Sequence, residues 1–598
     1  MISSNHSFYI PVMGLAFTID SPVKVARFGI SSVVSITEDR LLETMRKHYY
    51  TMIGEPFKPI SPKDPDFRAK RVTDYLNLLN RMVNDQVEKM KASAFKAGSD
   101  LVKYFEMLPD DSKLKQLYLR MTETHSGSEK ESLQIFLRSQ VKPGSIDVNI
   151  MTKLDKPAYD HNGQEIPENS DALSALRGYA MSDLTNSSII FSAGMNPKLF
   201  NYIDKFPVFE PTDWGQFKKH IVIKVSDFRS ALVQGKILAK KGIWVSEFRI
   251  ESGLNCGGHA FATDGYLMGP ILQEFKDKRE ELLYELHEIY NRASEGKKKP
   301  LFTRPHPQRI TFQGGIGTAE EDLFLRTYYQ LDATGWGTPF LLCPEATTVD
   351  KETLHQLQKA TKDDVALSKN SPLGVRFHYL KGNSGEVEKE KRVKSGRPGS
   401  PCTEKHLVNN TEFTSEPICT ASKKYQALKV EQLKSMQLPE EELDRKLKDV
   451  YAKECLCVGL SNSASLVYNV PFVKKLTSVT ICPGPNIANF SKVVTLRNMV
   501  DHIYGRLNIM TNNMRPHVFI NELNIYVAYF REQVEEQLAD VKQVAFNQKF
   551  GRKLLEGIAY YRSIEQAIRH SSIADALHAA ETEITGLLNR LAPTPAVV

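Results

Sequence analysis

Eight short apolar segments constrain the fold of this chain more than any other feature of its sequence. They lie at residues 8–13, 30–36, 146–150, 189–191, 221–225, 243–245, 309–313 and around 334–336, and helical stretches separate most of them. They are apolar on both faces, as parallel strands are when helices cover the sheet. This alternation predicts an α/β fold, and eight strands favour a (β/α)8 TIM barrel over a doubly wound open sheet.

The predicted barrel spans residues 1–350. One helical region is inserted within it, and two further regions follow it. Residues of about 40–140 carry apolar side chains at helical spacing, for example from Phe67 to Lys91, and predict a helical insertion. Residues 351–425 include the polar run GNSGEVEKEKRVKSGRPGSPC and predict an extended loop or lid. Residues 426–598 predict a mostly helical C-terminal extension, which we expect to pack against the barrel, a second subunit in a homodimer, or a synthase partner.

Composition excludes several classes of protein. The net charge of +7 over 598 residues is mild and gives no reason to invoke a nucleic-acid partner. No apolar stretch approaches the ~18 residues of a membrane span. The seven cysteines are few and odd in number, which fits reduced thiols and a cytoplasmic location. Cys455-x-Cys457 has no second ligand pair at metal-binding spacing, so we expect no metal site.

Two glycine clusters follow the last two predicted strands. Gly314-Gly315 opens a helix, where free N–H groups and the helix dipole can bind an anion, and Gly337-Thr338 lies at the corresponding place after strand eight. The loops after strands seven and eight of a TIM barrel commonly bind a phosphate. For each cluster taken alone, the alternative to a phosphate site is an ordinary tight turn.

A third cluster, Gly257-Gly258-His259, follows predicted strand six. A histidine behind two glycines can approach a ligand closely and exchange a proton at neutral pH. The alternative is an ordinary surface histidine. For the neighbouring Cys256, the role of a small buried side chain that fills space in the core is favoured over that of a redox-active thiol. The charged run 389–397 is predicted as a solvated loop. His306 lies on a loop before strand seven, where an ordinary loop position is favoured over a place near the site.

The order of these motifs carries a family resemblance. The motifs are Met13-Gly14 ending strand one, Val148-Asn149-Ile150 in strand three, Gly257-Gly258-His259 after strand six, Gly314-Gly315-Ile316 after strand seven, and Gly337-Thr338-x-Phe340 after strand eight, with Glu345 beyond. Over residues 8–350, outside the insertion, the chain resembles the nitronate monooxygenase (2-nitropropane dioxygenase-like) family of FMN-dependent TIM barrels. That family includes FMN-containing enoyl reductases, and the enlarged chain also resembles the enoyl reductase proteins of polyunsaturated fatty acid synthases.

The resemblance implies how FMN would bind. Gly314, Gly315, Gly337 and Thr338 would contact its phosphate through their backbones. Met13 and Gly14 would lie near the flavin ring and Lys224 near the flavin. Gly257 and Gly258 are further expected cofactor-binding residues. His259 would be the catalytic base or charge stabiliser.

Three functions follow as hypotheses. The first is nitronate monooxygenase-like oxidation of a small carbon acid or nitronate with O2, in which His259 removes an α-proton. The second is NAD(P)H-dependent, FMN-dependent reduction of an enoyl acyl substrate in fatty acid or polyketide synthesis. The third is a non-catalytic barrel scaffold whose extensions bind a partner.

Overall fold

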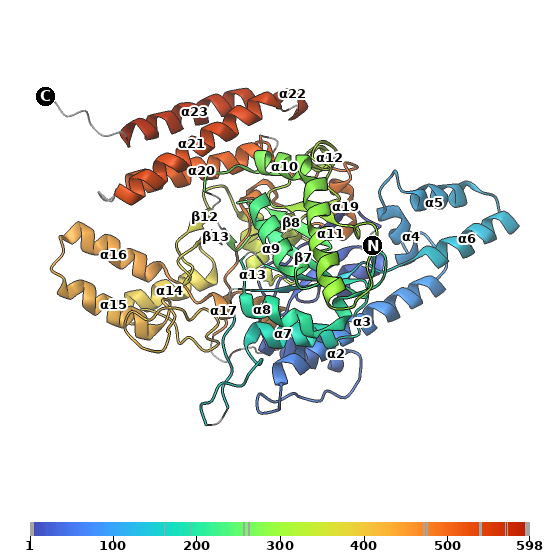
Figure 1. Ribbon diagram of the computed structural model, residues 1–598, viewed down its shortest axis with the longest axis horizontal. Helices are drawn as coiled ribbons and strands as arrows, with labels where there is room; N and C mark the ends of the chain where they lie inside the picture. The colour runs from blue at the N-terminus through green and yellow to red at the C-terminus, as the bar shows by residue number, and fades with distance from the viewer. Residues whose placement is uncertain are drawn as a thin grey trace.

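Eight parallel strands close into a barrel in the computed structural model of the chain (Figure 1). The structure describes residues 5–152, 154–160, 162–192, 194–254, 257–260, 264–470, 473, 476–512, 514–536, 541–568, 570 and 572–591. Around the barrel the strand order is β1-β11-β10-β8-β7-β4-β3-β2, and β2 pairs again with β1. The barrel strands are β1 (Phe8–Ile10), β2 (Ser31–Ser35), β3 (Ile146–Ile150), β4 (Ser187–Phe191), β7 (Lys219–Val225), β8 (Glu247–Glu251), β10 (Arg309–Gln313) and β11 (Ala333–Gly335). The predicted TIM barrel is therefore confirmed.

Helices and short strands connect the barrel strands. From β1 to β7 these elements are α1 (Ser21–Val25), η1 (Ala26–Phe28), α2 (Asp39–Met52), α3 (Phe67–Ala92), α4 (Asp100–Met107), α5 (Lys113–Glu123), α6 (Ser128–Gln140), α7 (Asp171–Met181), α8 (Pro197–Tyr202), η2 (Ile203–Lys205), η3 (Pro207–Phe209), β5 (Pro211–Asp213) and β6 (Gln216–Phe217). From β7 to β11 they are α9 (Phe228–Ala239), β9 (His259–Ala260), α10 (Met268–Asp277), α11 (Arg279–Gly296) and α12 (Ala319–Tyr328). Five of these helices, α2 to α6, lie between β2 and β3, where the helical insertion was expected.

The chain after β11 adds a small sheet and further helices. Its elements are η4 (Thr338–Leu342), α13 (Lys351–Lys359), β12 (Val365–Ser368), β13 (Arg376–Leu380), α14 (Ser384–Lys394), α15 (Lys423–Ser435), α16 (Glu440–Ala452), α17 (Leu456–Gly459), α18 (Asn462–Tyr468), η5 (Pro485–Asn489), α19 (Leu496–Ile503), α20 (Val518–Glu535), α21 (Val541–Ser563), α22 (Glu565–Ile568) and α23 (Ile573–Arg590). Helices α20, α21 and α23 pack together and onto α10, and Figure 1 shows them as one layer in orange to red. Among the described residues, no helix has both the length and the apolar character that a membrane span requires.

Strand six differs from its predicted position. The apolar segment 243–245 precedes it, and the strand itself is β8, in which Glu247, Arg249 and Glu251 alternate with Phe248 and Ile250. Phe248 and Ile250 join the main hydrophobic core. Pairing offsets the free-energy cost of burying the charged residues, because Arg249 Nε donates to Glu247 Oε1 at 2.8 Å. Charged and apolar residues therefore alternate along this strand, which is not apolar on both faces.

The polar run after residue 382 also differs from the predicted loop, because it contains the helix α14. The Asn383 side chain caps the first turn by accepting a hydrogen bond from Glu386 N at 3.1 Å. Ion pairs at i,i+4 spacing join Arg392 to Glu388 and Lys394 to Glu390. Charge pairing and a cap therefore make this run helical despite its low hydrophobicity.

Candidate functional site

A cavity of about 1110 Å³, partly open to solvent, lies at the carboxyl ends of the barrel strands. This is the end of a TIM barrel at which active sites are built. Strand ends contribute polar side chains to its wall, namely Ser35, Asn149, Lys224 and Glu251. Segments after β11 contribute mainly apolar ones, among them Leu373, Phe377, Leu407, Leu456 and Leu460. The cavity therefore has a polar floor and a largely apolar cover.

An ion pair forms part of the polar floor. Lys224 Nζ, at the end of β7, lies 3.0 Å from Glu251 Oε2 and 3.3 Å from Oε1 at the end of β8. Gln313 Nε2 donates to the same carboxylate at 2.6 Å. Both Lys224 and Glu251 are largely buried. A fixed cation at the cavity wall can stabilise negative charge that develops on a bound ligand.

An acceptor without a described partner lines the same cavity. Asn149 at the end of β3 is 3% exposed and lines the cavity. Its Oδ1 has no hydrogen-bond partner within the part of the chain that the structure describes. A buried polar atom of this kind carries a free-energy cost until a ligand or water pairs with it. It therefore marks a position where a ligand N–H or O–H would bind.

His259 also lines the cavity and lies in the short strand β9. This strand pairs antiparallel with β13, and His259 is opposite Phe377 in the register. His259 Nε2 lies 2.6 Å from Ser371 Oγ, and its ring packs edge-on against Phe377 with centroids 5.1 Å apart. The sheet and the hydrogen bond together orient the imidazole on the cavity wall.

A second histidine, His406, lines the same cavity. Its Nε2 is hydrogen-bonded to the carboxylate of Glu38, and its Nδ1 lies 3.7 Å from Asp171 Oδ2. Burial lowers the pKa of His406, but the adjacent Glu38 carboxylate outweighs this effect, so the pKa is raised overall. His406 thus connects the segment after α14 to the helices α2 and α7.

The structure brings half of the predicted site residues together. Gly14, Lys224, Gly257, Gly258 and His259 line the cavity. The other predicted residues do not line it. Met13 belongs to the hydrophobic core, and the glycine loops with Gly314, Gly315, Gly337 and Thr338 face other parts of the chain.

The chain itself covers the loop after β10. A Cβ on Gly315 would lie 2.3 Å from Leu254 Cδ1, and Arg515 Nη2 donates to the Gly315 carbonyl at 2.7 Å. At the start of α12, Gly317 N donates to Glu321 Oε2 at 2.8 Å. Arg515 Nη1 pairs with Glu321 Oε1 at 2.6 Å. A carboxylate of the protein therefore occupies the anion-binding position predicted for a phosphate.

The loop after β11 is covered in a similar way. Gly484 N donates to Thr338 Oγ1 at 3.0 Å, and Asn486 Nδ2 donates to the Ile316 carbonyl at 2.8 Å. Thr338 is 4% exposed. Residues 484–489 thus lie against both glycine loops.

These contacts test whether FMN fits the residues predicted for it. The ring side fits, because a Cβ on Gly258 would have no atom within 4 Å and Asn149 offers an unused acceptor. The phosphate side does not fit, because Glu321, Arg515 and residues 484–489 occupy the two loops. The predicted FMN phosphate site is therefore filled by the protein itself.

Two further predictions have definite outcomes, and a third lies outside the described residues. His306 is not near the site: it precedes β10, at the amino end of the barrel, and packs among Phe217, Trp244 and Phe302. Burial lowers its pKa to about 4, so the ring is neutral. The charged run 389–397 lies largely in α14. Cys256 lies outside the residues that the structure describes.

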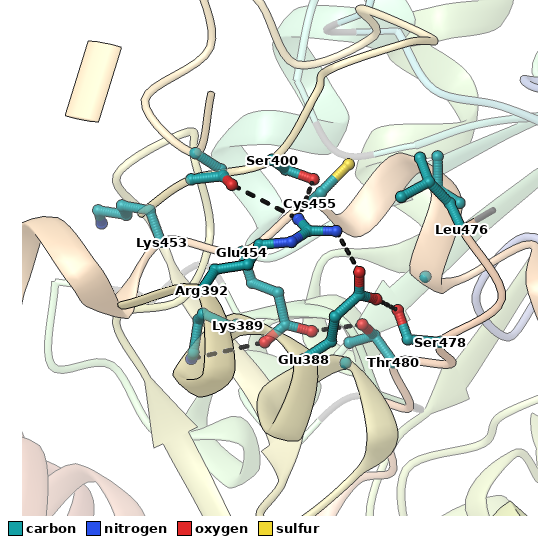
Figure 2. A pocket seen from close by; sticks show the side chains of 15 residues that line it. Glu388, Lys389, Arg392, Ser400, Lys453, Glu454, Cys455, Leu476, Ser478 and Thr480 are labelled. Atoms are coloured by element: carbon teal, nitrogen blue, oxygen red, sulfur yellow. Dashed lines mark hydrogen bonds and ion pairs between the residues drawn. The ribbon is translucent and has the colours of Figure 1, made fainter. Parts of the chain in front are cut away.

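A second cavity, of about 460 Å³, lies between α14 and residues 476–480. Figure 2 shows that Arg392 pairs with Glu388 and that Lys389 pairs with Glu454. Arg392 binds Glu388 and Ser400, and Lys389 Nζ lies 3.5 Å from Glu454 Oε2. Since each of these paired side chains already has a partner of opposite charge, a structural role is favoured for this cavity over ligand binding.

Sequence reasoning missed Glu38, His406 and Ser371 as site residues. Glu38 caps α2 just after β2, whereas Ser371 and His406 come from segments after the barrel, and no motif links any of the three to the site. Glu251 carried one usable indication, because the alternating charges of residues 247–251 are unusual in a buried strand.

Comparison with known proteins adds little to this geometry. No known protein family matches the sequence, and no curated protein matches it. Among solved structures, the chain is similar to the enoyl reductase domain of MlnA from the macrolactin biosynthesis cluster of Bacillus amyloliquefaciens. The match covers 80% of this chain and 92% of that chain, with 14% identity and a TM-score of 0.30. A likeness at this level carries no argument, so the resemblance to the nitronate monooxygenase family stays a prediction.

Proposed function

We propose that the cavity at the barrel mouth is the active site of an oxidoreductase that reduces an apolar α,β-unsaturated acyl substrate. One observation carries this proposal: the Lys224–Glu251 pair and His259 lie in the same cavity as a largely apolar cover of leucine and phenylalanine side chains. A long apolar cover suits an acyl chain better than a small nitronate. The enoyl reductase hypothesis is therefore favoured over nitronate oxidation.

Each part of the wall has a role in this proposal. Leu373, Leu456 and Leu460 would contact the acyl chain and exclude water. The Lys224 ammonium would face the acyl carbonyl oxygen and stabilise the negative charge that develops there during reduction. His259, oriented by Ser371, would supply the proton that the α-carbon takes up.

The electrons would come from a reduced nicotinamide. A flavin is not assigned this role, because the glycine loops predicted to hold the FMN phosphate are occupied by the chain. When bound, the nicotinamide would supply a hydride equivalent to the β-carbon.

The test is a parallel assay of two reactions on the full chain. We expect NADH or NADPH oxidation with medium-chain α,β-unsaturated thioesters and no O2 uptake with a nitronate. Lys224→Gln should reduce this turnover by about a hundredfold. The control is Lys218→Gln, at an exposed lysine just before β7, which should leave turnover unchanged. Nitronate-dependent O2 uptake without nicotinamide consumption would overturn the proposal in favour of the oxidase hypothesis. Absence of both reactions and of a bound flavin spectrum would favour the scaffold hypothesis.

A further inference from the structure

Four cysteines from two distant parts of the chain line one small cavity of about 260 Å³. Cys402 and Cys419 lie at the two ends of the segment between α14 and α15, and Cys455 and Cys457 lie at the start of α17. All six cysteines of the described residues are free thiols. This cavity adjoins the barrel-mouth cavity, with which it shares Leu407, Leu456 and Cys457, and it is lined by four of the six.

Two of these thiols are in direct contact. The side chains of Cys402 and Cys419 are hydrogen-bonded to each other. Cys419 is 5% exposed, whereas Cys402 is only partly buried. An accessible thiol beside a buried one is the arrangement of a reactive and a resolving cysteine.

The surroundings favour the thiolate form of Cys402. The hydrogen bond from Cys419 lowers the pKa of Cys402 to about 7, and the nearby Lys405 and His406 act in the same direction. The pKa of Cys419 is raised, first by its contact with Cys402 and then by burial. The two thiols therefore have different roles: one is ready to react at neutral pH and the other stays protonated.

We propose that Cys402 and Cys419 form a reversible disulfide when the protein meets a hydroperoxide. The Cys402 thiolate attacks one peroxide oxygen, the O–O bond breaks, and the leaving oxygen takes a proton to become water or an alcohol. Cys402 is then a sulfenic acid. The Cys419 sulfur attacks the Cys402 sulfur, the S–O bond breaks, and the hydroxyl leaves as water with the Cys419 proton. Two thiols lose two electrons in total, and the peroxide gains them.

The position of this pair connects it to the barrel-mouth cavity. The segment between Cys402 and Cys419 carries His406 and Leu407, which line that cavity. A disulfide would close this segment into a loop and restrict its movement. Among the described residues, no group of three or more potential ligands is placed to hold a metal ion, which favours the disulfide over a metal centre.

The experiment is thiol mapping of the full chain. The reduced protein is exposed to stepwise equivalents of hydrogen peroxide, quenched with N-ethylmaleimide, unfolded, digested and analysed by mass spectrometry. We expect one cross-link, between the peptides containing Cys402 and Cys419. We also expect oxidation at least about tenfold faster than that of the buried Cys343.

Single variants separate the two roles. Cys419→Ser should stop at a Cys402 sulfenic acid that dimedone traps, and Cys402→Ser should leave Cys419 reduced. Cys343→Ala is the matched control and should keep the cross-link, and circular dichroism checks that each variant is folded. A cross-link between another pair, or alkylation of Cys402 no faster than that of Cys343, would overturn the proposal. Zinc bound in stoichiometric amount and released by thiol modification would also overturn it, because the four cysteines would then be ligands.

Discussion

The carboxylate of Glu321 lies 2.6 Å from the guanidinium of Arg515, and both side chains are almost fully buried. The same carboxylate accepts hydrogen bonds from Gly317 N at 2.8 Å and Val518 N at 2.6 Å. Burial alone would raise the pKa of Glu321, but Arg515 holds this pKa below its ordinary value. The start of α12, where the glycine motif predicted a phosphate, is therefore neutralised by a charge from within the chain.

Removing one partner of this pair should destabilise the protein strongly. Arg515→Met leaves the Glu321 carboxylate buried without its cation, and we expect a loss of about 3–5 kcal/mol in the free energy of unfolding. Urea denaturation measures this loss. The exposed pair Arg531–Glu583 provides the control, because Arg531→Met should cost less than about 1 kcal/mol. Equal losses in the two variants would contradict a specific role for the buried pair.

The same site predicts a rescue by phosphate. In Glu321→Ala, Gly317 N and Arg515 lose their anion, so inorganic phosphate should bind there and raise the melting temperature. The wild-type protein, whose carboxylate already fills the position, should show a smaller shift at the same ionic strength. Thermal shift in phosphate against chloride of matched ionic strength measures the difference. Equal shifts for the two proteins would show that phosphate does not replace the carboxylate.

Two adjacent glycines on the cavity wall should respond differently to the same substitution. A Cβ on Gly257 would lie 1.8 Å from the Cys482 carbonyl oxygen, so Gly257→Ala should cost about 3 kcal/mol by separating the two segments. A Cβ on Gly258 meets no atom within 4 Å, and only its φ of 85° carries strain, about 1 kcal/mol. Gly258→Ala should therefore fold. Its added methyl group lies at the cavity wall, however, and should weaken the binding of the unsaturated acyl thioester. Urea denaturation and ligand titration together distinguish these outcomes, and similar stabilities for the two variants would contradict the packing argument.

Parts of the fold that depend on local pattern were predictable from the sequence. The strand at 309–313 and the helix from Phe67 were found where the apolar spacing predicted them. Strand six was placed too early, because Glu247 and Arg249 neutralise each other inside the barrel and no local rule expects charges there. The α14 helix was missed because its stability comes from a cap and ion pairs, not from an apolar face.

The candidate site was predictable only where strand ends supply it. Lys224 lies at the end of a barrel strand and His259 follows one, so their place at the carboxyl end of the barrel followed from the topology. Glu38 and His406 are 368 residues apart and meet only because the segment after α14 folds back over the barrel. The cover on the glycine loops depends on a similar long-range contact, between Arg515 and Glu321, which the motif itself does not contain.

The His406–Glu38 contact predicts a pH dependence of stability. The folded pKa of His406 is raised above the ordinary ~6.5, so the folded state holds the proton more tightly than the unfolded state. The stabilisation is therefore complete below about pH 6.5 and is lost as the pH rises through the folded value. Asp171, Asp39 and Arg68 also face this ring.

The measurement is the free energy of unfolding of wild type and His406→Gln from pH 6 to 9. The advantage of the wild type over the variant should shrink as the pH rises. His125→Gln, at an exposed position between α5 and α6, should show no such trend. A difference between wild type and His406→Gln that is constant with pH would show that the proton on His406 does not stabilise the fold.

His259 is the residue whose loss should separate chemistry from binding. His259→Gln keeps a polar side chain beside Ser371 and Phe377, so the sheet of β9, β13 and β12 should be retained and stability should change by less than about 1 kcal/mol. Without the imidazole, proton transfer to the substrate should slow by about a hundredfold while KM for the acyl thioester changes little. Steady-state kinetics with the unsaturated thioester, run beside His125→Gln, measures both quantities. A variant with unchanged turnover would show that another group supplies the proton, and the carboxylate of Glu251 would then be the next residue to test, because it lies on the same floor.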